Sequence, residues 1–468
     1  MSTRITHEPE PEENPEENLI NRPRSRRSFV KGSLAVGAAA AAGPGVLAAC
    51  GDDDDDGGGS SEADWDGKTI RVVGLGVDLI DPIAQAAEKA TGYKYEFTVR
   101  DTPTTTQLSI TQPENFDILS GYNQQIPQIM EAGVMQWIPV SKVTEWENSV
   151  PLLTTGKLRP ECTTGQGQAL YRMLPTPDAQ AVELTAGNPF EAMLQEQVPE
   201  GEFITGVTGN FNVDSMGYNR DAPEFNGEPV TSWAALVDPN VKGKVALIND
   251  PQIGTVDAAM ALEAAGKIQF ENKANMTPEE IDEMMKMLTD MKRSGFFRAF
   301  WSTFDESVNL MASGEVVIES MWSPAVALLA EQGQNVGFAA PEEGFRGWGG
   351  IMMVFDHVGQ GKKLDACLEY MNWWQSGEPG AIMARQGYYN PVPQNVRKNL
   401  SKAEWDYWYG GKPAAEELVG PSGEKQLPKG DVREGGSFEE RICRYNTWNT
   451  QQPEAQLLTQ RWNDFIAA

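Results

Sequence analysis

Residues 69–99 read TIRVVGLGVDLIDPIAQAAEKATGYKYEFTV. The apolar start, residues 69–73, predicts a short strand, and residues 82–91 have the composition of a helix. Residues 93–99 then alternate aromatic or apolar side chains with polar ones, which is typical of a half-buried strand. The same order, strand then helix, follows over residues 116–132. This alternation predicts a doubly wound α/β fold.

The α/β pattern resumes after residue 211, beyond residues 150–205, which are rich in Thr, Pro, Gly and Gln and which we interpret as an insertion or long loop. The predicted strands are residues 245–248, 316–322 and 351–355, and the predicted helices are residues 256–265, 277–291 and 364–374. Thr277 and Glu280 form a capping box at the start of one helix. The length of 468 residues is enough for two lobes.

The N-terminal segment has the order of an export signal. Arg26 and Arg27 stand in a twin-arginine pattern, which is an address read by a receptor. Residues 34–49 form a small-apolar run that is too short and too weakly apolar for a good membrane-spanning helix. The run ends in LAAC, which resembles a bacterial lipobox whose Cys50 becomes the acylated first residue. We predict that residues 1–49 are a twin-arginine lipoprotein signal; a plain signal peptide with a chance cysteine is the alternative.

Residues 50–64 contain a run of Asp followed by Gly and Ser. Charge repulsion and glycine keep such a segment from building a core, so we interpret it as a tether. The alternative is a low-complexity segment with no spacing role. The expected location is the periplasm or the outer face of the cell membrane, with the chain held there by lipid.

The charge of the chain excludes some partners. Its 67 acidic and 38 basic residues give a net charge of −29. Nucleic-acid binding requires patches of Lys and Arg, so no nucleic acid is expected as a partner. A solvated surface suited to a salty medium and attraction of cationic ligands both agree with this charge. Because the sequence has two histidines, a His-rich zinc site is not expected, and we predict no metal and no cofactor.

Three cysteines remain beside Cys50. Cys367 lies in an apolar helical pattern and is interpreted as a buried thiol. Cys162 and Cys443 would pair in an oxidising compartment, but the sequence does not decide whether they do.

No catalytic signature stands out. Gly74 and Gly76 follow a strand, but Leu79 replaces the third glycine of a dinucleotide fingerprint. The sequence also lacks a P-loop, a GxSxG motif and an HExxH motif. We therefore expect a protein that is not an enzyme; an exported hydrolase or lyase is the alternative.

Several blocks of the sequence, in order, resemble the periplasmic solute-binding proteins of ABC importers, specifically the spermidine/putrescine-binding family. The blocks are FDILSGY (116–122), MGYN (216–219), VTSW (230–233), KGK (242–244), ASGEV (312–316), the glycine-rich residues 344–350, interpreted as a loop, and GYYNPVP (387–393). The resemblance begins near residue 69 and reaches the C-terminus, with poor matches over residues 150–205 and 400–440.

The resemblance implies a two-lobed periplasmic-binding-protein fold with discontinuous lobes joined by hinge crossovers. Lobe one would hold residues 65–210 and 350–396, and lobe two would hold residues 211–349 and 397–468. It also implies a monomeric receptor that closes on a small-molecule ligand and docks on an ABC permease in the membrane.

That family binds amines with aromatic rings and carboxylates. Ring faces attract cations, and carboxylates form charge-assisted hydrogen bonds with ammonium groups. The positions matched to the family's site are Trp322, Trp348, Asp250, Tyr388, Ser120 and Tyr122. The resemblance therefore predicts a small organic cation, such as a polyamine or a related amine. The aromatic residues would otherwise serve as core, and Asp250 would otherwise cap the following helix.

Two acids of the family pattern are absent. Gln252 or Ile253 stands at one of these positions and Gly350 at the other. Asp78 and Glu319 are further acids whose place the sequence does not give. The loss of acids leaves the charge of the ligand open.

Two other ligands therefore stay possible. Ser323 and Pro324 begin a predicted helix, and helix N-termini bind anions, which would suit an anionic or zwitterionic ligand such as an amino-phosphonate. The pair Tyr388–Tyr389 would instead offer hard oxygen ligands to ferric iron.

Overall fold

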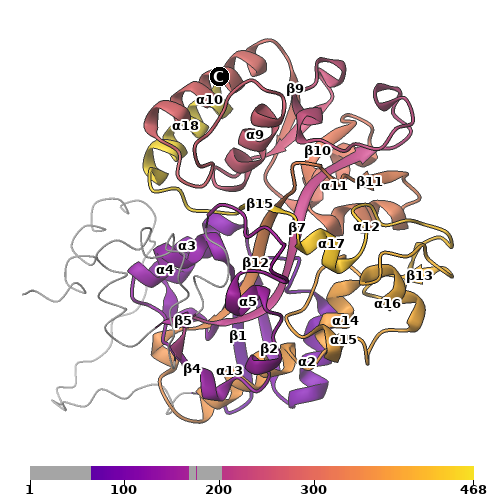
Figure 1. Ribbon diagram of the computed structural model, residues 1–468. Coiled ribbons are helices and arrows are strands. Elements are labelled where there is room, and N and C mark those ends of the chain that lie inside the picture. The colour runs from indigo at the N-terminus through magenta and orange to yellow at the C-terminus, as the bar shows by residue number, and fades with distance from the viewer. Residues whose placement is uncertain (1–64, 168–174, 177–202) are drawn as a thin grey trace, which may run out of the picture. The chain divides into compact units, whose positions relative to one another are not determined.

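The computed structural model describes residues 65–167, 175–176 and 203–468 (Figure 1). Ten strands form one sheet in the order β2-β1-β3-β12-β7-β10-β8-β9, with β15 paired to β12 and β11 paired to β7. Its strands are β1 (Thr69–Gly74), β2 (Lys94–Val99), β3 (Ile118–Tyr122), β7 (Val207–Asn219), β8 (Val245–Ile248), β9 (Phe297–Trp301), β10 (Ile318–Met321), β11 (Val336–Phe338), β12 (Phe345–Val354) and β15 (Tyr445–Trp448). Two small sheets join β4 (Ile138–Pro139), β5 (Pro175–Thr176) and β6 (Phe203–Ile204), and β13 (Leu418–Val419) and β14 (Lys425–Leu427).

Helices connect the strands in the order that the sequence predicts. They are α2 (Asp81–Thr91), α3 (Thr102–Thr111), α4 (Ile126–Glu131), α5 (Leu152–Thr155), α9 (Ile253–Ala264), α10 (Pro278–Arg293), α11 (Phe304–Ala312), α12 (Ser323–Glu331), α13 (Lys362–Trp374), α14 (Glu378–Ala384), α15 (Pro393–Val396), α16 (Lys402–Trp408), α17 (Phe438–Ile442) and α18 (Ala455–Ala467). Gly92 ends α2 in the left-handed conformation, as its position indicates. The capping box of Thr277 and Glu280 at the start of α10 is confirmed.

Helices pack on both faces of the sheet. On β1, Val72 lies in a buried cluster with α2 and α13, whereas its neighbour Val73 lies in the cluster that holds α4. On β8, Leu247 lies in the cluster with α9 and α10, and Ile248 lies in the cluster with α11 and α12. Because successive strand residues point to opposite faces, each end of the sheet is doubly wound. The predicted α/β class is confirmed.

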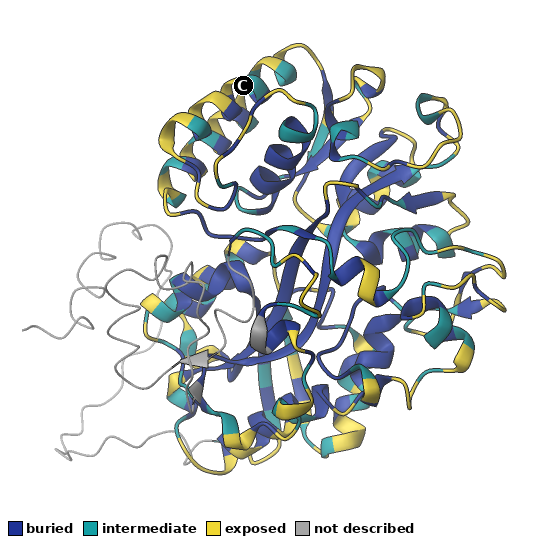
Figure 2. Ribbon diagram, in the orientation of Figure 1, coloured by how far each residue is buried: buried dark blue, intermediate teal, exposed yellow. Residues whose placement is uncertain are grey.

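The two long strands β7 and β12 connect the two ends of the sheet. They pair antiparallel with each other, and both are buried along almost their whole length (Figure 2). β12 also pairs with β3, and β7 also pairs with β10. The predicted lobe boundaries after residues 210 and 349 fall inside these two strands, and the boundaries themselves stay a prediction.

The C-terminal part of the chain packs in two places. Tyr407 and Phe438 share a buried cluster with Leu119 of β3, whereas Leu458 and Trp462 of α18 share a cluster with α10. The assignment of all residues 397–468 to one lobe stays a prediction.

The glycine-rich segment over residues 344–350 is strand, not loop, so the predicted loop was wrong: β12 begins at Phe345. A Cβ atom on Gly347 would lie 2.5 Å from the ring of Tyr445, and one on Gly350 would lie 2.4 Å from Oδ1 of Asn210. Glycine is required here because neighbouring side chains approach the strand closely.

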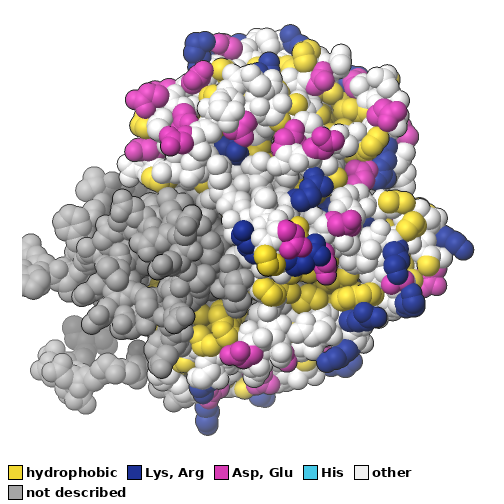
Figure 3. Space-filling model, viewed as in Figure 1, with side chains coloured by type: hydrophobic (Ala, Val, Ile, Leu, Met, Phe, Trp, Pro, Cys, Tyr) yellow, Lys and Arg dark blue, Asp and Glu magenta, His cyan; other side chains and the backbone are white. Residues whose placement is uncertain are grey.

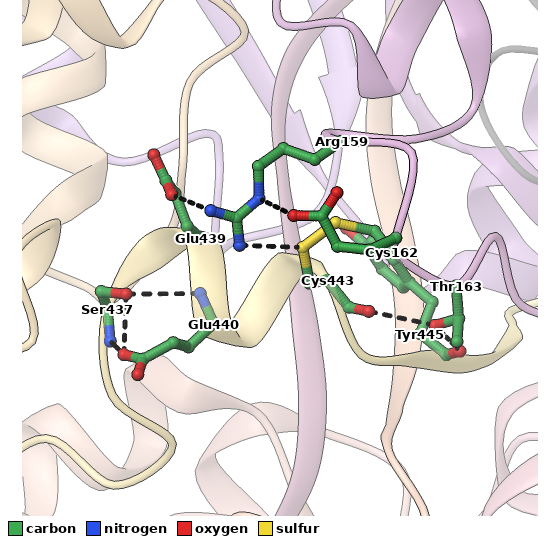
Figure 4. The surroundings of a disulfide bond; sticks show 9 residues. Arg159, Cys162, Thr163, Ser437, Glu439, Glu440, Cys443 and Tyr445 are labelled. Carbon is green, nitrogen blue, oxygen red and sulfur yellow. Dashed lines mark hydrogen bonds and ion pairs between the residues drawn. A yellow bond between two sulfur atoms is a disulfide. The ribbon is translucent and has the colours of Figure 1, made fainter.

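A disulfide joins Cys162 to Cys443 across 281 positions of sequence (Figure 4). Beside it, Nη1 of Arg159 lies 2.7 Å from Oε2 of Glu439, and the hydroxyl of Thr163 donates to the carbonyl of Tyr445 at 2.7 Å. The pairing that the sequence left open is therefore present, and it ties the segment before the undescribed residues 168–174 to the end of α17. Cys367 is a free, buried thiol.

We predict that the variant Cys162→Ser lowers the free energy of unfolding by about 2–4 kcal/mol, because a cross-link over a long loop restricts the unfolded chain. Urea unfolding followed by tryptophan fluorescence measures the loss. Treating the wild-type protein with a thiol-free reductant should produce the same loss and should leave the variant unchanged. Equal stability of reduced and oxidised wild-type protein would contradict the prediction.

The surface carries both signs of charge. Acidic side chains are spread over the face drawn in Figure 3, with Lys and Arg among them. Pairs such as Lys286–Asp290 at 3.0 Å are exposed on both sides, so they contribute little to stability.

The predicted export signal, Cys50 and the acidic tether lie outside the described residues. Within residues 65–167, 175–176 and 203–468, every helix is too short or too polar to cross a membrane.

Candidate functional site

One small pocket collects side chains from many elements of the large sheet, and we call it the candidate pocket. Its lining residues are Leu75, Val77, Thr102, Tyr122, Gln124, Asp214, Ile253, Trp322, Arg346, Trp348, Tyr388 and Asn449. Its free volume is about 20 Å³, which is room for about one water molecule. Its own side chains therefore nearly fill it.

The topology of the sheet places these residues together. Leu75 follows β1 and Tyr122 ends β3, and these strands are parallel. Ile253 begins α9 after β8, and Trp322 follows β10, which is parallel to β8. In α/β sheets, ligands bind beyond the carboxyl ends of parallel strands. The candidate pocket lies at such ends from both parts of the sheet.

Three aromatic rings form one wall. The ring of Trp348 lies 4.6 Å from the ring of Tyr388 and 5.5 Å from the ring of Tyr122, measured between centroids. All three side chains are buried. Trp322 is partly exposed and packs edge-on against Trp301, with centroids 5.2 Å apart. These rings offer an apolar, electron-rich surface.

A buried network of charges forms a second wall. Arg346 donates from Nε to Oδ1 of Asp257 at 2.6 Å and from Nη1 to Oδ1 of Asn449 at 2.7 Å. Its Nη2 lies 3.5 Å from Oδ2 of Asp214. The other oxygen of Asp214, Oδ1, is buried and has no hydrogen-bond partner among the described residues. Nε1 of Trp348 is also buried without a hydrogen-bond partner among the described residues, and its interaction with the carboxyl group of Asp214 lowers the pKa of that group.

A second carboxylate, Asp78, lies behind the aromatic wall. Its Oδ2 accepts hydrogen bonds from the hydroxyls of Tyr122 at 2.7 Å and Ser120 at 3.3 Å. Its Oδ1 accepts a hydrogen bond from Nδ2 of Asn210 at 2.7 Å. Asp78 therefore fixes the ring of Tyr122 at the pocket.

Burial shifts the ionisation of both carboxyl groups. Burial raises the pKa of Asp78 to about 6, against the hydrogen bonds from Tyr122, Asn210 and Ser120, which lower it. Burial also raises the pKa of Asp214 to about 6, against the attraction of Arg346. A cation bound nearby would favour the charged form of each and lower both pKa values.

A comparison with known protein families identifies the family of this chain. Residues 83–408 match the profile of a family described as bacterial extracellular solute-binding protein. The chain belongs to this family. The family is described as solute-binding, and the candidate pocket is accordingly considered as a binding site. Among curated proteins, none matches the sequence.

Solved structures share the fold of this solute-binding protein at low sequence identity. A protein described as a spermidine/putrescine ABC transporter from Listeria monocytogenes is 15% identical, with a TM-score of 0.56, and 85% of this chain and 99% of that chain are covered. The spermidine/putrescine substrate-binding protein of Streptococcus pneumoniae is 14% identical, with a TM-score of 0.54 and coverage of 86% and 98%. A binding protein of Agrobacterium tumefaciens in complex with glucopine is 12% identical, with a TM-score of 0.52 and coverage of 85% and 99%. The predicted two-lobed binding-protein fold is confirmed.

The structure of this solute-binding protein brings four of the six predicted site residues together in the candidate pocket: Trp322, Trp348, Tyr388 and Tyr122. Ser120 does not line the pocket but holds Asp78. Asp250 also does not line it, and its Oδ1 accepts the backbone N–H groups of Gln252 and Ile253 at 2.8 and 3.0 Å. A ligand role for Asp250 stays a prediction.

The two adjacent tyrosines point to different places. Tyr388 packs against Trp348 in the candidate pocket. The hydroxyl of Tyr389 accepts a hydrogen bond from Arg433 at 2.8 Å, and its ring packs on Phe438 at 4.7 Å. Iron would need both phenolic oxygens at one point, so this arrangement does not favour ferric iron. The described part of the chain contains no group of three or more His, Cys, Asp or Glu side chains that would hold a metal ion.

Two charged residues of the pocket were missed by the sequence interpretation, namely Asp214 and Arg346. A signal for Asp214 exists in β7. Polar Thr208, Asn210, Asn212 and Asp214 alternate there with other residues, in a strand that is buried along almost its whole length. A buried strand with one polar face indicates a polar site on that face. Arg346 carries no comparable signal, because its three partners come from distant segments.

Proposed function

We propose that this solute-binding protein is the receptor of an ABC importer and that its ligand is a small organic cation, such as a polyamine or a related amine. The observation that carries the proposal is the buried, unpartnered Oδ1 of Asp214 beside the aromatic wall. A buried carboxylate oxygen without a partner is costly, and an ammonium group would satisfy it. Rings of Trp348 and Tyr388 would contact the cation with their faces.

The balance of charge in the site supports a cation over an anion. Arg346 lines the pocket, but Asp257, Asn449 and Asp214 already surround its guanidinium group. An anion would have to displace one of these partners, whereas a cation would use an oxygen that is free. Proteins with the same fold are named for spermidine and putrescine, and another is bound to glucopine, so the fold accepts more than one ligand class.

The mechanism we propose is closure around the ligand. Because the candidate pocket has a free volume of about 20 Å³, its walls must separate to admit a whole amine. Strands β7 and β12 cross between the two ends of the sheet and would act as the hinge. Docking of the closed, monomeric form on a membrane permease would follow.

We predict that Asp214→Asn weakens binding of putrescine by about 10–100-fold at pH 7.5, because the variant loses a charge-assisted hydrogen bond of about 1.5–3 kcal/mol. Isothermal titration calorimetry measures the dissociation constant. Lowering the pH to 5 should also weaken putrescine binding by the wild-type protein. Protonation of Asp214, whose pKa is about 6, removes the same negative charge that Asp214→Asn removes.

The control variant is Asp305→Asn, which changes an exposed aspartate of α11. Succinate is the matched dianion for putrescine, and 1,4-butanediol is the matched neutral compound. The cation proposal would be wrong if succinate bound more tightly than putrescine, or if Asp214→Asn bound putrescine as tightly as the wild type. Either result would favour an anionic or zwitterionic ligand.

We also propose that the protein is lipid-anchored at Cys50 after export by the twin-arginine route. The order of twin arginine, apolar run and lipobox supports this. We predict that Cys50→Ala moves the protein from the membrane fraction to the soluble fraction, measured by immunoblot after a high-salt wash. A variant that stays with the membrane after the wash would contradict the anchor.

A further inference from the structure

A second pocket, with a free volume of about 290 Å³, lies beside the candidate pocket and is much larger. Its lining includes Val326 and Ala330 of α12, Phe338 of β11, Trp408 of α16, and Arg441 of α17. Ser323 and Gly387, which also line it, are next in sequence to Trp322 and Tyr388 of the candidate pocket. The two pockets therefore share the segments that separate them.

Arg441 is the most buried cation of this second pocket, with 1% of its surface exposed. Its Nη1 donates to the backbone carbonyl of Glu434 at 2.6 Å, and its guanidinium plane lies 5.1 Å from the ring of Phe345. Nε and Nη2 have no hydrogen-bond partner among the described residues. These two nitrogens form the edge that grips a carboxylate with two parallel hydrogen bonds.

The carboxylates around the second pocket do not neutralise Arg441. Oδ2 of Asp431 accepts the hydroxyl of Tyr407 at 2.6 Å. Oε1 of Glu434 is held by Arg220 at 2.7 Å, and its Oε2 has no hydrogen-bond partner in the described part of the chain. No described carboxylate lies within ion-pair distance of Arg441. Burying a guanidinium group without an ion pair costs free energy, so an anion bound beside Arg441 would be stabilised.

A second arginine adds to the positive charge. Arg433 lines the same pocket, and Nη1 and Nη2 donate to the backbone carbonyls of Trp408 and Gly387, each at 2.7 Å. It also lacks an ion pair with any carboxylate that the structure describes. Burial, with the repulsion of Arg433, lowers the pKa of Arg441 to about 10, so Arg441 remains charged at neutral pH.

The other wall of the second pocket is apolar. Val326, Ala327 and Ala330 present one side of α12, and Leu427 and Pro428 face the pocket from the end of β14. An inorganic anion would contact the arginines but would leave this wall uncovered. A hydrocarbon chain attached to the anion would bury it and gain from the hydrophobic effect.

We propose that this second pocket binds a small organic carboxylate with a short apolar chain, at a site separate from the candidate pocket. The carboxylate accepts hydrogen bonds from Nε and Nη2 of Arg441, and the chain lies along α12. Because both nitrogens are closed to solvent, binding requires the side chain of Arg441 to turn toward the pocket. Because Ser323 donates to the carbonyl of Gln386 at 3.1 Å in the shared wall, the ligand would rest against the segments that carry Trp322 and Tyr388.

Hexanoate is the probe for this proposal, with 1-hexanol and hexylamine as matched neutral and cationic compounds and with inorganic phosphate as an anion that lacks a chain. Calorimetry on the wild-type protein should show binding of hexanoate that is at least about tenfold tighter than binding of the other three. Arg441→Gln should weaken hexanoate binding about tenfold or more.

Two further variants separate the outcomes. Ala330→Phe fills the pocket from α12 without changing any charge, so it should abolish hexanoate binding even where Arg441→Gln fails to fold. Trp348→Ala changes the candidate pocket and should leave hexanoate binding unchanged. Hexanoate binding that equals hexanol binding, or that survives in Ala330→Phe, would overturn the proposal; phosphate binding as tight as hexanoate would overturn the role of the apolar wall.

Discussion

The variant Arg346→Met should lower the free energy of unfolding by about 3–5 kcal/mol at pH 7.5. Arg346 is 1% exposed and lies between the carboxylates of Asp257 and Asp214. Removing the guanidinium group leaves both carboxylates buried without a countercharge, and this destabilises the folded state. Urea unfolding with linear extrapolation measures the difference.

A matched surface arginine serves as the control. Arg461 lies 2.6 Å from Asp282, and the side chains of this pair are 35% and 53% exposed, far more than that of Arg346. Arg461→Met should therefore change stability by less than about 1 kcal/mol. Adding Asp257→Asn to Arg346→Met should restore part of the lost stability. Equal effects of the Arg346 and Arg461 variants would show that the buried network has no special role.

The stability of the protein should fall as the pH rises from about 5 to about 8, in part because of Glu319. Its side chain is fully buried in β10, with one oxygen bound to the hydroxyl of Ser307 at 2.7 Å and the other without a partner in the described chain. Burial raises its pKa from 4.5 to about 8, against the hydrogen bond from Ser307. The folded state therefore keeps a proton on Glu319 in a range where the unfolded chain releases it.

The sign of the effect follows from this difference. The contribution of Glu319 to stability is fully present below pH 4.5 and is lost as the pH rises to about 8. The loss is on the order of 3–5 kcal/mol, since each pKa unit corresponds to about 1.4 kcal/mol. Glu319→Gln cannot ionise, so it should be more stable than the wild type at pH 8.5 but not at pH 5.

Unfolding of both proteins by urea across this pH range measures the difference. Subtracting the two curves removes the contributions of other buried acids such as Asp78 and Asp214, which are common to both proteins. Glu315→Gln, at a half-exposed position, should show no comparable pH-dependent gain. A constant difference in stability between Glu319→Gln and wild type from pH 5 to pH 8.5 would contradict a raised pKa of Glu319.

The sequence by itself determined the local elements and the class of the fold. Alternation over residues 93–99 predicts β2, the capping box at Thr277 predicts α10, and both are present because they depend on neighbours within a few residues. The order of family blocks also indicated four residues that the structure places in one pocket. These signals are local or positional, so a single chain is enough to carry them.

The tertiary structure decided the charges of the site and the strand that carries them. Residues 344–350 look like a loop in isolation, but residues 345–350 are strand in β12 because they pair with β7 and β15, which lie far away in sequence. Glycine is needed at positions 347 and 350 because Tyr445 and Asn210 approach them closely. Asp214 and Arg346 become site residues through partners that lie far away in sequence. The energy and the role of a buried charge depend on the groups around it, and these groups come together when distant segments of the chain pack.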